Sequence, residues 1–289
     1  MRSLLIVPAV AGDDLAAALG HGADAVVVDL EETVAAEAKT AGRTAMADFV
    51  AAHAARLDRP RLFVRVNGFA SGLVDADLDA AIAAGCDGIV LPKAGGGMEI
   101  TRLDAKIAVA EAVHAVPEGR TRIVAEVAET AQAVLQIATY RGASRRLIGM
   151  GWGTADLAAD LGTGATHGAD GALLDAFRLA RTLTLLGAVA AECAPIDAST
   201  LPSGDLDRLA AECRAAARDG FTAKFATDPA QIATINAAFT PDAEAIAEAT
   251  RVVTALTAAG DGEPTTLDGG AARARLARAR RVLARAGLD

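Results

Sequence analysis

The sequence predicts an α/β fold, namely a (β/α)8 TIM barrel that is followed by a C-terminal helical extension. Short apolar runs recur along the chain, and each is followed by an amphipathic, alanine-rich stretch that is long enough for a helix. The runs are continuous rather than alternating, which is typical of parallel strands that are buried on both faces. Because there are eight such runs, the strands can close into a barrel.

The predicted strands and helices alternate along the chain. Strands are expected at residues 4–7, 25–30, 62–66, 88–91, 122–128, 147–149, 194–196 and 222–225. Helices are expected at residues 14–19, 35–55, 74–84, 99–116, 130–139, 171–186 and 206–218. An open, doubly wound sheet is the alternative, but the turn after its first strand would carry a GxGxxG sequence. That turn here reads Pro8-Ala9-Val10-Ala11-Gly12, which favours the barrel.

The barrel is predicted to occupy residues 1–239, and residues 240–289 form a helical extension that is a candidate lid. Within this extension the expected elements are a helix at 242–258, a loop at 260–266 and a helix at 270–286. The second helix is rich in arginine on an alanine and leucine background. These arginines either form a solvated face with ion pairs or bind an anionic ligand.

The amino-acid composition limits the kinds of molecule that the protein can bind. Lysine and arginine number 28 against 37 aspartates and glutamates, which gives a formal net charge of −9. Such a charge repels phosphate backbones, and an aromatic content of 3% leaves little on which bases could stack. No apolar run approaches the roughly 18–20 residues that span a bilayer, and the apolar N-terminal stretch is too short for a signal peptide. We therefore expect a cytoplasmic protein that binds a small molecule, not nucleic acid or membrane.

Polar side chains are dense at the predicted C-terminal strand ends, where a barrel carries its active site. A single carboxylate at a strand end is more often a helix cap, but here several strand ends carry charged residues. They are Asp29 and Glu31 after the second strand, Arg65 at the third, Lys93 after the fourth, Glu129 after the fifth and Asp156 after the sixth. We expect Asp29, Glu31 and Lys93 to support the residues that contact metal or substrate.

Glu129 and Asp156 are the predicted ligands of a Mg²⁺ ion. This ion is typically held by one or two carboxylates, with water and substrate oxygens completing its octahedron. The two residues close adjacent strands, whose axes lie about 4.8 Å apart, so both carboxylates can reach one ion. Glu126 precedes Glu129 by an odd offset, which on a regular strand places it on the opposite face. We therefore interpret Glu126 as an ion-pair partner that faces the helices.

Other metal chemistry has little support in the sequence. The four histidines share no ligand spacing: His21, His53, His114 and His167. The three cysteines lack CxxC spacing and are interpreted as buried small side chains without a disulfide or zinc: Cys86, Cys193 and Cys213. An oxygen-ligated ion is therefore favoured over a transition metal.

The turn before the Asp156 helix is a predicted substrate contact. Glycines alternate up to Gly153, and free backbone N–H groups at Gly153, Thr154 and Ala155 would bind a carboxylate or a phosphate. A tight turn between strand and helix is the alternative explanation for these glycines.

Arg65 is the second predicted substrate contact and a candidate catalytic residue. Its guanidinium is a forked donor that suits a carboxylate or a phosphate. The alternative is a structural ion pair with Asp29 or Glu31, because an inward arginine without a partner would carry a severe desolvation cost.

Taken in order, these segments resemble the HpcH/HpaI aldolase and citrate lyase β-subunit (CitE-like) family. The motifs that carry the resemblance are the family's RSxLFxP, which here reads RSLLIVP at residues 2–8, its DLEDxV, which reads DLEETV at 29–34 and is followed by Lys39 and Arg43, VRVN at 64–67, LPK at 91–93, ET at 129–130 and GxxDLAADLG at 153–162. Any one motif is weak, but the ordered set covers roughly residues 1–240 and is specific.

The resemblance implies an enzyme, a carbon–carbon lyase that binds Mg²⁺ through Glu129 and Asp156. Family members cleave or form a 3-hydroxyacyl-CoA thioester, commonly of the malyl-CoA or citramalyl-CoA type, with Arg65 on the small acid or enolate. The family also suggests a homo-oligomer, in particular a homotrimer. Some relatives use a C-terminal aspartate of a neighbouring subunit as a base, for which Asp268 is the candidate here.

The sequence departs from the family pattern at two places. Thr227-Asp228-Pro229-Ala230-Gln231 stands where relatives usually carry an HPxQ motif, and Glu32 replaces the final acid of DLED. Two other functions therefore stay open. One is a pyruvate-dependent hydroxy-keto-acid aldolase that uses no CoA, against which the C-terminal extension argues mildly. The other is a non-catalytic acyl-binding subunit, which the altered HPxQ segment favours.

Overall fold

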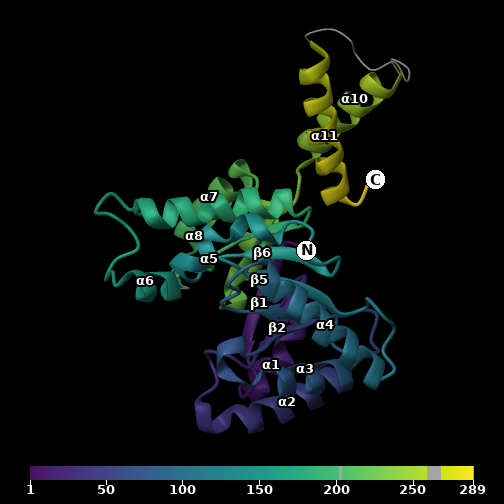
Figure 1. The fold of residues 1–289 in the computed structure, drawn as a ribbon. Helices are drawn as coiled ribbons and strands as arrows, with labels where there is room; N and C mark the ends of the chain where they lie inside the picture. The colour runs from purple at the N-terminus through teal and green to yellow at the C-terminus, as the bar shows by residue number, and fades with distance from the viewer. Residues whose placement is uncertain (202–203, 259–267, 289) are drawn as a thin grey trace. The chain divides into compact units, whose positions relative to one another are not determined.

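The computed structural model describes residues 1–201, 204–258 and 268–288. Eight parallel strands close into a barrel in which neighbours along the chain are also neighbours in space (Figure 1). They are β1 (Ser3–Pro8), β2 (Ala25–Asp29), β3 (Arg61–Arg65), β4 (Gly88–Leu91), β5 (Arg122–Glu126), β6 (Leu147–Gly151), β7 (Ala194–Asp197) and β8 (Ala223–Ala226). The predicted barrel is therefore confirmed.

Helices follow the strands and cover the outside of the barrel. They are α1 (Gly12–Ala17), α2 (Lys39–His53), α3 (Val74–Ala83), α4 (Gly97–Val113), α5 (Ala131–Leu135), α6 (Ala155–Leu161), α7 (Asp175–Ala190), α8 (Leu206–Asp219) and α9 (Ile232–Phe239). Helix α3 packs against both α2 and α4 on one side of the barrel (Figure 1). The loops that leave the C-terminal strand ends form one face, on which the polar residues predicted from the sequence lie.

Some element boundaries differ from the prediction. β5 ends at Glu126 rather than at residue 128, because its neighbours β4 and β6 end beside it and offer no further ladder partner. The helix expected at 130–139 is divided into α5 and a 3₁₀ turn at Ile137–Tyr140. Helix α7 begins at Asp175, later than expected.

The barrel interior is filled by apolar side chains. The core cluster consists of Leu4, Ala25, Val27, Phe63, Val90, Val124, Ile196, Ala223 and Phe225. β6 contributes glycine instead, because a Cβ atom at Gly149 would lie 2.8 Å from Ile196 Cδ1. A side chain at this position would displace the core, which explains part of the glycine alternation in the sequence.

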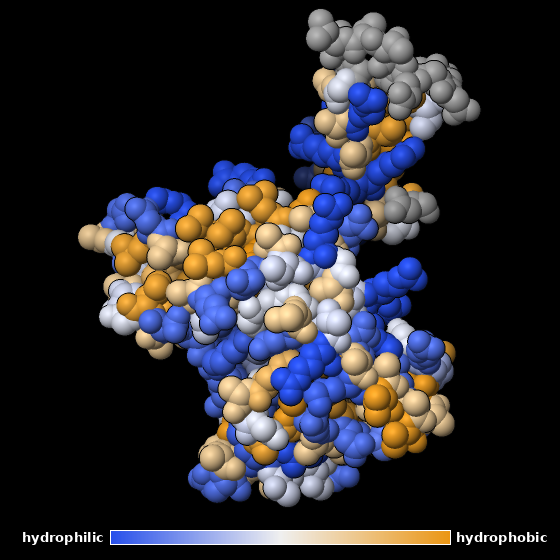
Figure 2. Space-filling view, viewed as in Figure 1, coloured by the Kyte–Doolittle hydropathy of each residue, from blue (hydrophilic) through white to orange (hydrophobic). Residues whose placement is uncertain are grey.

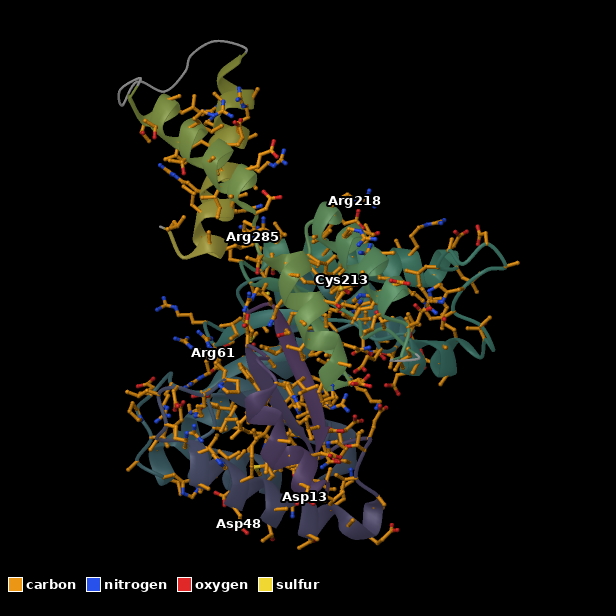
Figure 3. All side chains as sticks on the ribbon, turned by 180° about the vertical axis from the view of Figure 1, so that it is seen from behind. Asp13, Asp48, Arg61, Cys213, Arg218 and Arg285 are labelled. Carbon is orange, nitrogen blue, oxygen red and sulfur yellow. The ribbon has the colours of Figure 1, made fainter. Side chains whose placement is uncertain are left out.

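The three cysteines are free thiols. Cys86 and Cys213 are buried and Cys193 is half-buried; Figure 3 marks Cys213 within the barrel unit. Burial raises the pKa of Cys86 to about 12 and that of Cys213 to about 11, so neither is a thiolate near neutral pH.

The chain divides into two compact units, Met1–Asn236 and Ala237–Asp289. In the second unit α10 (Ala243–Ala258) packs against α11 (Asp268–Ala286). Their shared core consists of Ala249, Val252, Ala279 and Leu283, with Ile246, Val253, Leu256 and Val282 packed against it. The loop expected at 260–266 lies outside the described residues.

The exposed face of α7 is partly apolar. Leu179, Leu186 and Val189 are all exposed there, and Figure 2 shows apolar surface over this helix. A homo-oligomer would cover such surface, and the oligomeric state itself stays a prediction. Among the described residues, no helix combines the length and the apolar character that crossing a membrane requires.

Candidate active site

A polar layer made of Asp29, Arg65 and Glu126 lies above the apolar barrel interior. Each stands two residues after a core residue of its own strand, and side chains of a strand alternate between its two faces. The three side chains therefore face the interior, at the C-terminal ends of β2, β3 and β5. All three are buried.

Arg65 and Asp29 form a two-pronged ion pair in this layer. Arg65 Nε and Nη2 donate hydrogen bonds of 2.7 and 2.8 Å to the two oxygens of Asp29. Burial alone would raise the pKa of Asp29, but the hydrogen bonds and charge of Arg65 outweigh it and leave the pKa below its usual value. The forked face of Arg65 is thus occupied by Asp29. Arg65 Nη1 instead lies 3.5 Å from Glu126 Oε2 and 3.9 Å from Glu31 Oε2.

Side chains from the family motifs fix the loops around this layer. Lys39 Nζ donates to the carbonyl oxygens of Leu30 and Glu31, at 2.7 and 2.6 Å. Asp77 accepts hydrogen bonds from the backbone and side-chain nitrogens of Asn67, and from Arg43 Nε at 2.8 Å. These contacts hold the loops after β2 and β3, and they give the Asn67 of VRVN a structural role that sequence reasoning did not assign.

Lys93 connects the carboxylates at the strand ends. Its φ angle is 51°, in the left-handed region that is uncommon for residues other than glycine. This conformation lets its backbone N–H donate to Glu129 Oε2 at 2.6 Å, while Nζ contacts Glu31 and lies 3.1 Å from Glu32 and 3.3 Å from Asp156. Burial would lower the pKa of Lys93, but these carboxylates raise it, so the side chain stays charged.

Glu129 and Asp156 both contact Lys93, the first at its backbone nitrogen and the second at Nζ. Glu129 is buried, whereas Asp156, in the first turn of α6, is partly exposed. Burial, and then the charges of Glu126 and Asp156, raise the pKa of Glu129 well above its usual value. A Cβ atom at Gly153 would lie 3.3 Å from Glu129 Oε1, so glycine lets this turn approach the carboxylate closely.

Glu126 corrects one interpretation of the sequence. It faces the barrel interior beside Arg65 and not the helices, because β5 ends at Glu126 and the chain then leaves the strand before Glu129. Counting two residues forward from the core residue Val124 assigns its face correctly. Burial raises the pKa of Glu126 to about 7 despite the charge of Arg65. Among the described residues, Glu126 Oε2 is the one buried side-chain oxygen or nitrogen without a hydrogen-bond partner.

The donor set fits a hard divalent cation. Carboxylates from Glu31, Glu32, Glu126, Glu129 and Asp156 gather here, and mutual repulsion contributes to the raised pKa values of Glu32, Glu126 and Glu129. A bound cation would relieve this repulsion. No group of three or more histidine, cysteine, aspartate or glutamate ligands is preassembled in the part of the chain that the structure describes. Two carboxylates, with the remaining positions left to water and substrate, match Mg²⁺.

A cavity of about 460 Å³ adjoins the site at the ends of β6, β7 and β8. Its lining includes Thr154, which belongs to the predicted substrate-binding turn, and Trp152, Asp197 and Lys224. The charged groups in its wall are paired: Lys224 Nζ lies 3.1 Å from Asp197 Oδ2, and Trp152 Nε1 donates to Asp197 Oδ1 at 2.9 Å. Thr154 links this cavity to the predicted substrate-binding turn, whereas Glu129, Asp156 and Arg65 do not line it.

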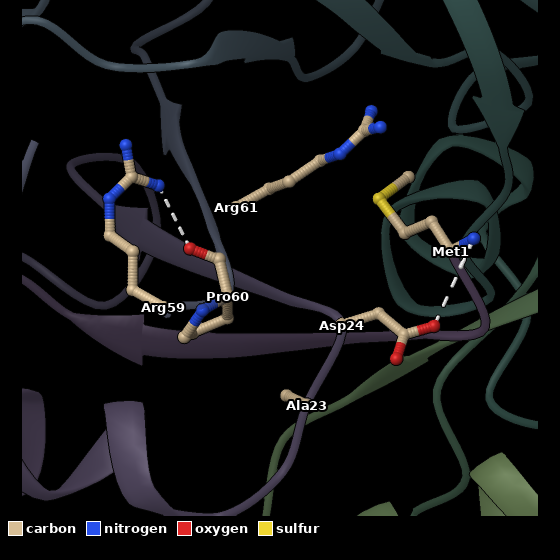
Figure 4. Close-up of a pocket in the computed structure, with 6 residues that line it drawn as sticks. All are labelled: Met1, Ala23, Asp24, Arg59, Pro60 and Arg61. Atoms are coloured by element: carbon tan, nitrogen blue, oxygen red, sulfur yellow. Dashed lines mark hydrogen bonds and ion pairs between the residues drawn. The ribbon is translucent and has the colours of Figure 1, made fainter. Parts of the chain in front are cut away.

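A hollow of about 380 Å³ lies near the N-terminal strand ends, lined by Met1, Ala23, Asp24, Arg59, Pro60 and Arg61 (Figure 4). Arg59 Nη1 donates to the carbonyl oxygen of Pro60 at 2.9 Å, and the Met1 amino group lies 3.9 Å from Asp24. Such contacts serve stability, because this end of a barrel is not the catalytic face. None of the polar-layer residues lines this hollow.

The segment that replaces HPxQ has a structural role. Asp228 Oδ1 accepts a hydrogen bond from the Ala230 N–H and caps the short 3₁₀ turn Pro229–Gln231. Gln231 is buried, accepts from the Thr227 N–H and donates to the carbonyl oxygen of Thr200. Asp268, the candidate base, is the first residue of α11, and its side chain lies outside the part that the structure describes.

Residues 2–229 match the HpcH/HpaI aldolase/citrate lyase family. The chain belongs to this family. It is 33% identical over 233 residues to a citrate lyase subunit beta-like protein of Mycobacterium tuberculosis, which covers 81% of this chain and 77% of the relative. It is also 33% identical over 258 residues to a (3S)-malyl-CoA thioesterase of Cereibacter sphaeroides, with 88% of this chain and 82% of the relative covered.

Solved structures agree with this assignment. A crystal structure of CitE from M. tuberculosis in complex with magnesium, acetoacetate and coenzyme A matches with a TM-score of 0.73 and 29% identity, covering 99% of this chain and 98% of that one. A citrate lyase beta subunit from M. tuberculosis, complexed with oxaloacetate and magnesium, matches with a TM-score of 0.70 and 32% identity, over 83% and 97%. The family is one of carbon–carbon lyases, which confirms the class of enzyme predicted from the sequence.

Proposed function

We propose that this protein is a Mg²⁺-dependent lyase that cleaves or forms the carbon–carbon bond of a 3-hydroxyacyl-CoA thioester, such as malyl-CoA or citramalyl-CoA. The observation that carries the proposal is the gathering of carboxylates around Lys93 at the ends of β2, β5 and β6, with the raised pKa of Glu129. Such an arrangement is unfavourable without a cation and is typical of a metal site.

Glu129 and Asp156 would hold the Mg²⁺ ion. When bound, Mg²⁺ supplies Lewis-acid stabilisation for oxygens of the 2-oxo acid that cleavage releases. The backbone N–H of Lys93 orients the Glu129 carboxylate through its 2.6 Å hydrogen bond. Glu31 and Asp29 in turn fix Lys93 and Arg65.

Arg65 Nη1 and the backbone N–H groups of Gly153, Thr154 and Ala155 would bind the acid and the developing enolate. Arg65 is positioned for this role because Asp29 holds its other nitrogens and fixes its orientation. Donors that are held in place before the reaction stabilise charge that develops in the transition state without reorganising. A neighbouring subunit would supply Asp268 as the base in the condensing direction.

Relatives support this substrate class. L-malyl-CoA/beta-methylmalyl-CoA lyases of Cereibacter sphaeroides and Rhodobacter capsulatus are each 29% identical to the chain. The CitE structure that covers nearly the whole chain holds coenzyme A together with magnesium. The (3S)-malyl-CoA thioesterases favour a second candidate function, hydrolysis of the same type of thioester.

Product analysis separates these functions. The purified protein would be incubated with malyl-CoA, citramalyl-CoA and free 4-hydroxy-2-oxo acids, each with Mg²⁺ and with a chelator. We expect Mg²⁺-dependent release of a 2-oxo acid, such as glyoxylate, together with an intact acyl-CoA. Release of free CoA thiol without a carbonyl product would indicate thioester hydrolysis instead. Cleavage of the free acids alone would indicate the aldolase, and binding without turnover would indicate the acyl-binding subunit.

A further inference from the structure

Glu126 is a buried carboxylate with an unused acceptor atom at the substrate site. The residue is 5% exposed, and its Oε2 atom has no hydrogen-bond partner among the described residues. A buried acceptor without a donor costs free energy, so native proteins rarely keep one unless a water or a ligand supplies the missing hydrogen bond.

The surroundings of Glu126 place this oxygen beside Arg65, in the polar layer at the C-terminal strand ends. The Glu126 side chain shares the interior face with Arg65, and Arg65 Nη1 lies 3.5 Å from Oε2. The remaining nitrogens of Arg65 are bound to Asp29 and cannot turn to satisfy Glu126. A donor and an unused acceptor therefore lie side by side above the apolar interior, between the β2 and β6 ends where the substrate is expected.

We propose that Glu126 contacts the substrate directly, accepting the hydrogen bond of its 3-hydroxyl group and taking that proton during carbon–carbon cleavage. This inference rests on the proposed lyase function. The substrate carries a hydroxyl donor next to its carboxylate. The protein offers the matching pair of groups, namely Arg65 as the donor to the carboxylate and Glu126 as the acceptor of the hydroxyl hydrogen bond. The raised pKa of Glu126, about 7, suits a group that gains and returns a proton near neutral pH.

The proton transfer balances as a retro-aldol step. The O–H bond breaks and its proton goes to Glu126 Oε2, while the oxygen electrons form the new carbonyl bond. The carbon–carbon bond breaks, and its electron pair passes into the enolate of the acyl-CoA fragment. After cleavage Glu126 releases this proton to water, which restores the carboxylate. In the condensing direction Glu126 starts protonated, gives its proton to the new alkoxide and takes up a proton from water before the next cycle.

Two substitutions test separate parts of the proposal. Glu126→Gln keeps a hydrogen-bond acceptor of nearly the same shape but cannot take up a proton. We expect kcat for cleavage to fall by about 10²-fold or more, the usual contribution of a general base, with substrate affinity within about threefold of the parent. Glu126→Leu removes the acceptor. We expect it to weaken malate binding at least about tenfold more than binding of oxaloacetate, which lacks the hydroxyl group.

The control is Glu111→Gln. Glu111 is also buried and is bound to Arg146 away from the site, so this variant should lose stability without changing kcat or the ratio of malate to oxaloacetate affinity.

Binding of malate and oxaloacetate is measured by calorimetry with Mg²⁺ present, which needs no turnover. If the parent protein cleaves no thioester but Glu126→Leu still loses its preference for malate, the lyase function fails and the Glu126 contact holds. If Glu126→Gln cleaves within threefold of the parent rate, or Glu126→Leu weakens both acids equally, the Glu126 proposal is overturned whatever the lyase assay shows.

Discussion

Arg65 donates two hydrogen bonds to Asp29, and its remaining nitrogen is the proposed substrate contact, so its geometry matters as much as its charge. Arg65→Lys keeps the charge but cannot reproduce the planar, two-pronged contact. We expect the free energy of unfolding to fall by about 1–3 kcal/mol, because Asp29 stays buried with weaker partners. Because the donor also moves, kcat/KM should fall on the order of 10²-fold. Urea unfolding and steady-state kinetics measure the two effects.

Arg146→Lys is the matched control for this substitution. Arg146 is buried and paired with Glu111 and Asp104, away from the polar layer. Its replacement should destabilise the protein to a similar degree and leave kcat/KM unchanged. If Arg65→Lys were as active as Arg146→Lys, the role of Arg65 would be structural alone.

Asp197 at the end of β7 makes side-chain contacts with residues of both neighbouring strand ends and of α7. It contacts Lys224 of β8, Trp152 after β6 and Arg181 of α7. Asp197→Asn would leave the buried Lys224 with Glu212, at 3.8 Å, as its remaining carboxylate partner, so we expect a loss of about 3 kcal/mol in the free energy of unfolding at pH 7. Asp219→Asn removes an exposed partner of Arg181 and should cost less than about 1 kcal/mol.

The effect of Asp197→Asn should depend on pH. Burial alone would raise the pKa of Asp197, but Lys224 and Arg181 hold it below its usual value. A carboxyl with a lowered folded-state pKa contributes stability that is complete above its unfolded pKa, about 3.9, and that is lost as the pH falls through the folded value. The difference between parent and variant in urea unfolding should therefore be full at pH 7 and shrink below about pH 4. A difference that stays constant down to pH 3 would contradict this account.

Local patterns in the sequence were sufficient to predict the strands, because most strand residues are buried and apolar and so form short apolar runs. They were not sufficient to predict where β5 ends, since that depends on the lengths of the neighbouring strands. For this reason the prediction that Glu126 faces the helices was wrong. The partner of Arg65 was left open between Asp29 and Glu31, and the β2–β3 register, which places Asp29 beside Arg65, decides it. The contacts of Lys93 depend on a left-handed backbone that no residue type at this position signals.

Truncation of the C-terminal unit tests whether the substrate is a CoA thioester or a free acid. If residues after Phe239 cover the CoA arm, truncation there should weaken thioester binding at least about tenfold and leave Mg²⁺ binding intact, because Glu129 and Asp156 belong to the barrel unit. Binding of a CoA thioester and of Mg²⁺, both by calorimetry, measures this. Sedimentation of the truncated protein shows whether the unit is instead an oligomer contact.

Asp268→Asn tests whether Asp268 of this unit acts as the base in the condensing direction. We expect it to suppress condensation of an acetyl-type thioester by about 10²-fold or more and to spare any cleavage of free hydroxy acids. Rates that are unchanged in every assay would remove Asp268 from the mechanism and weaken the preference for a CoA substrate.

Mg²⁺ titration by calorimetry tests the central claim most directly, because the proposed chemistry depends on an ion held by Glu129 and Asp156. The parent protein should bind one Mg²⁺ ion per chain. Glu129→Gln and Asp156→Asn should each lower the affinity by more than about tenfold, since even outer-sphere partners of a metal contribute that much. Glu118→Gln, which changes an exposed carboxylate outside the site, should bind like the parent. Undiminished Mg²⁺ binding in both Glu129→Gln and Asp156→Asn would contradict the account.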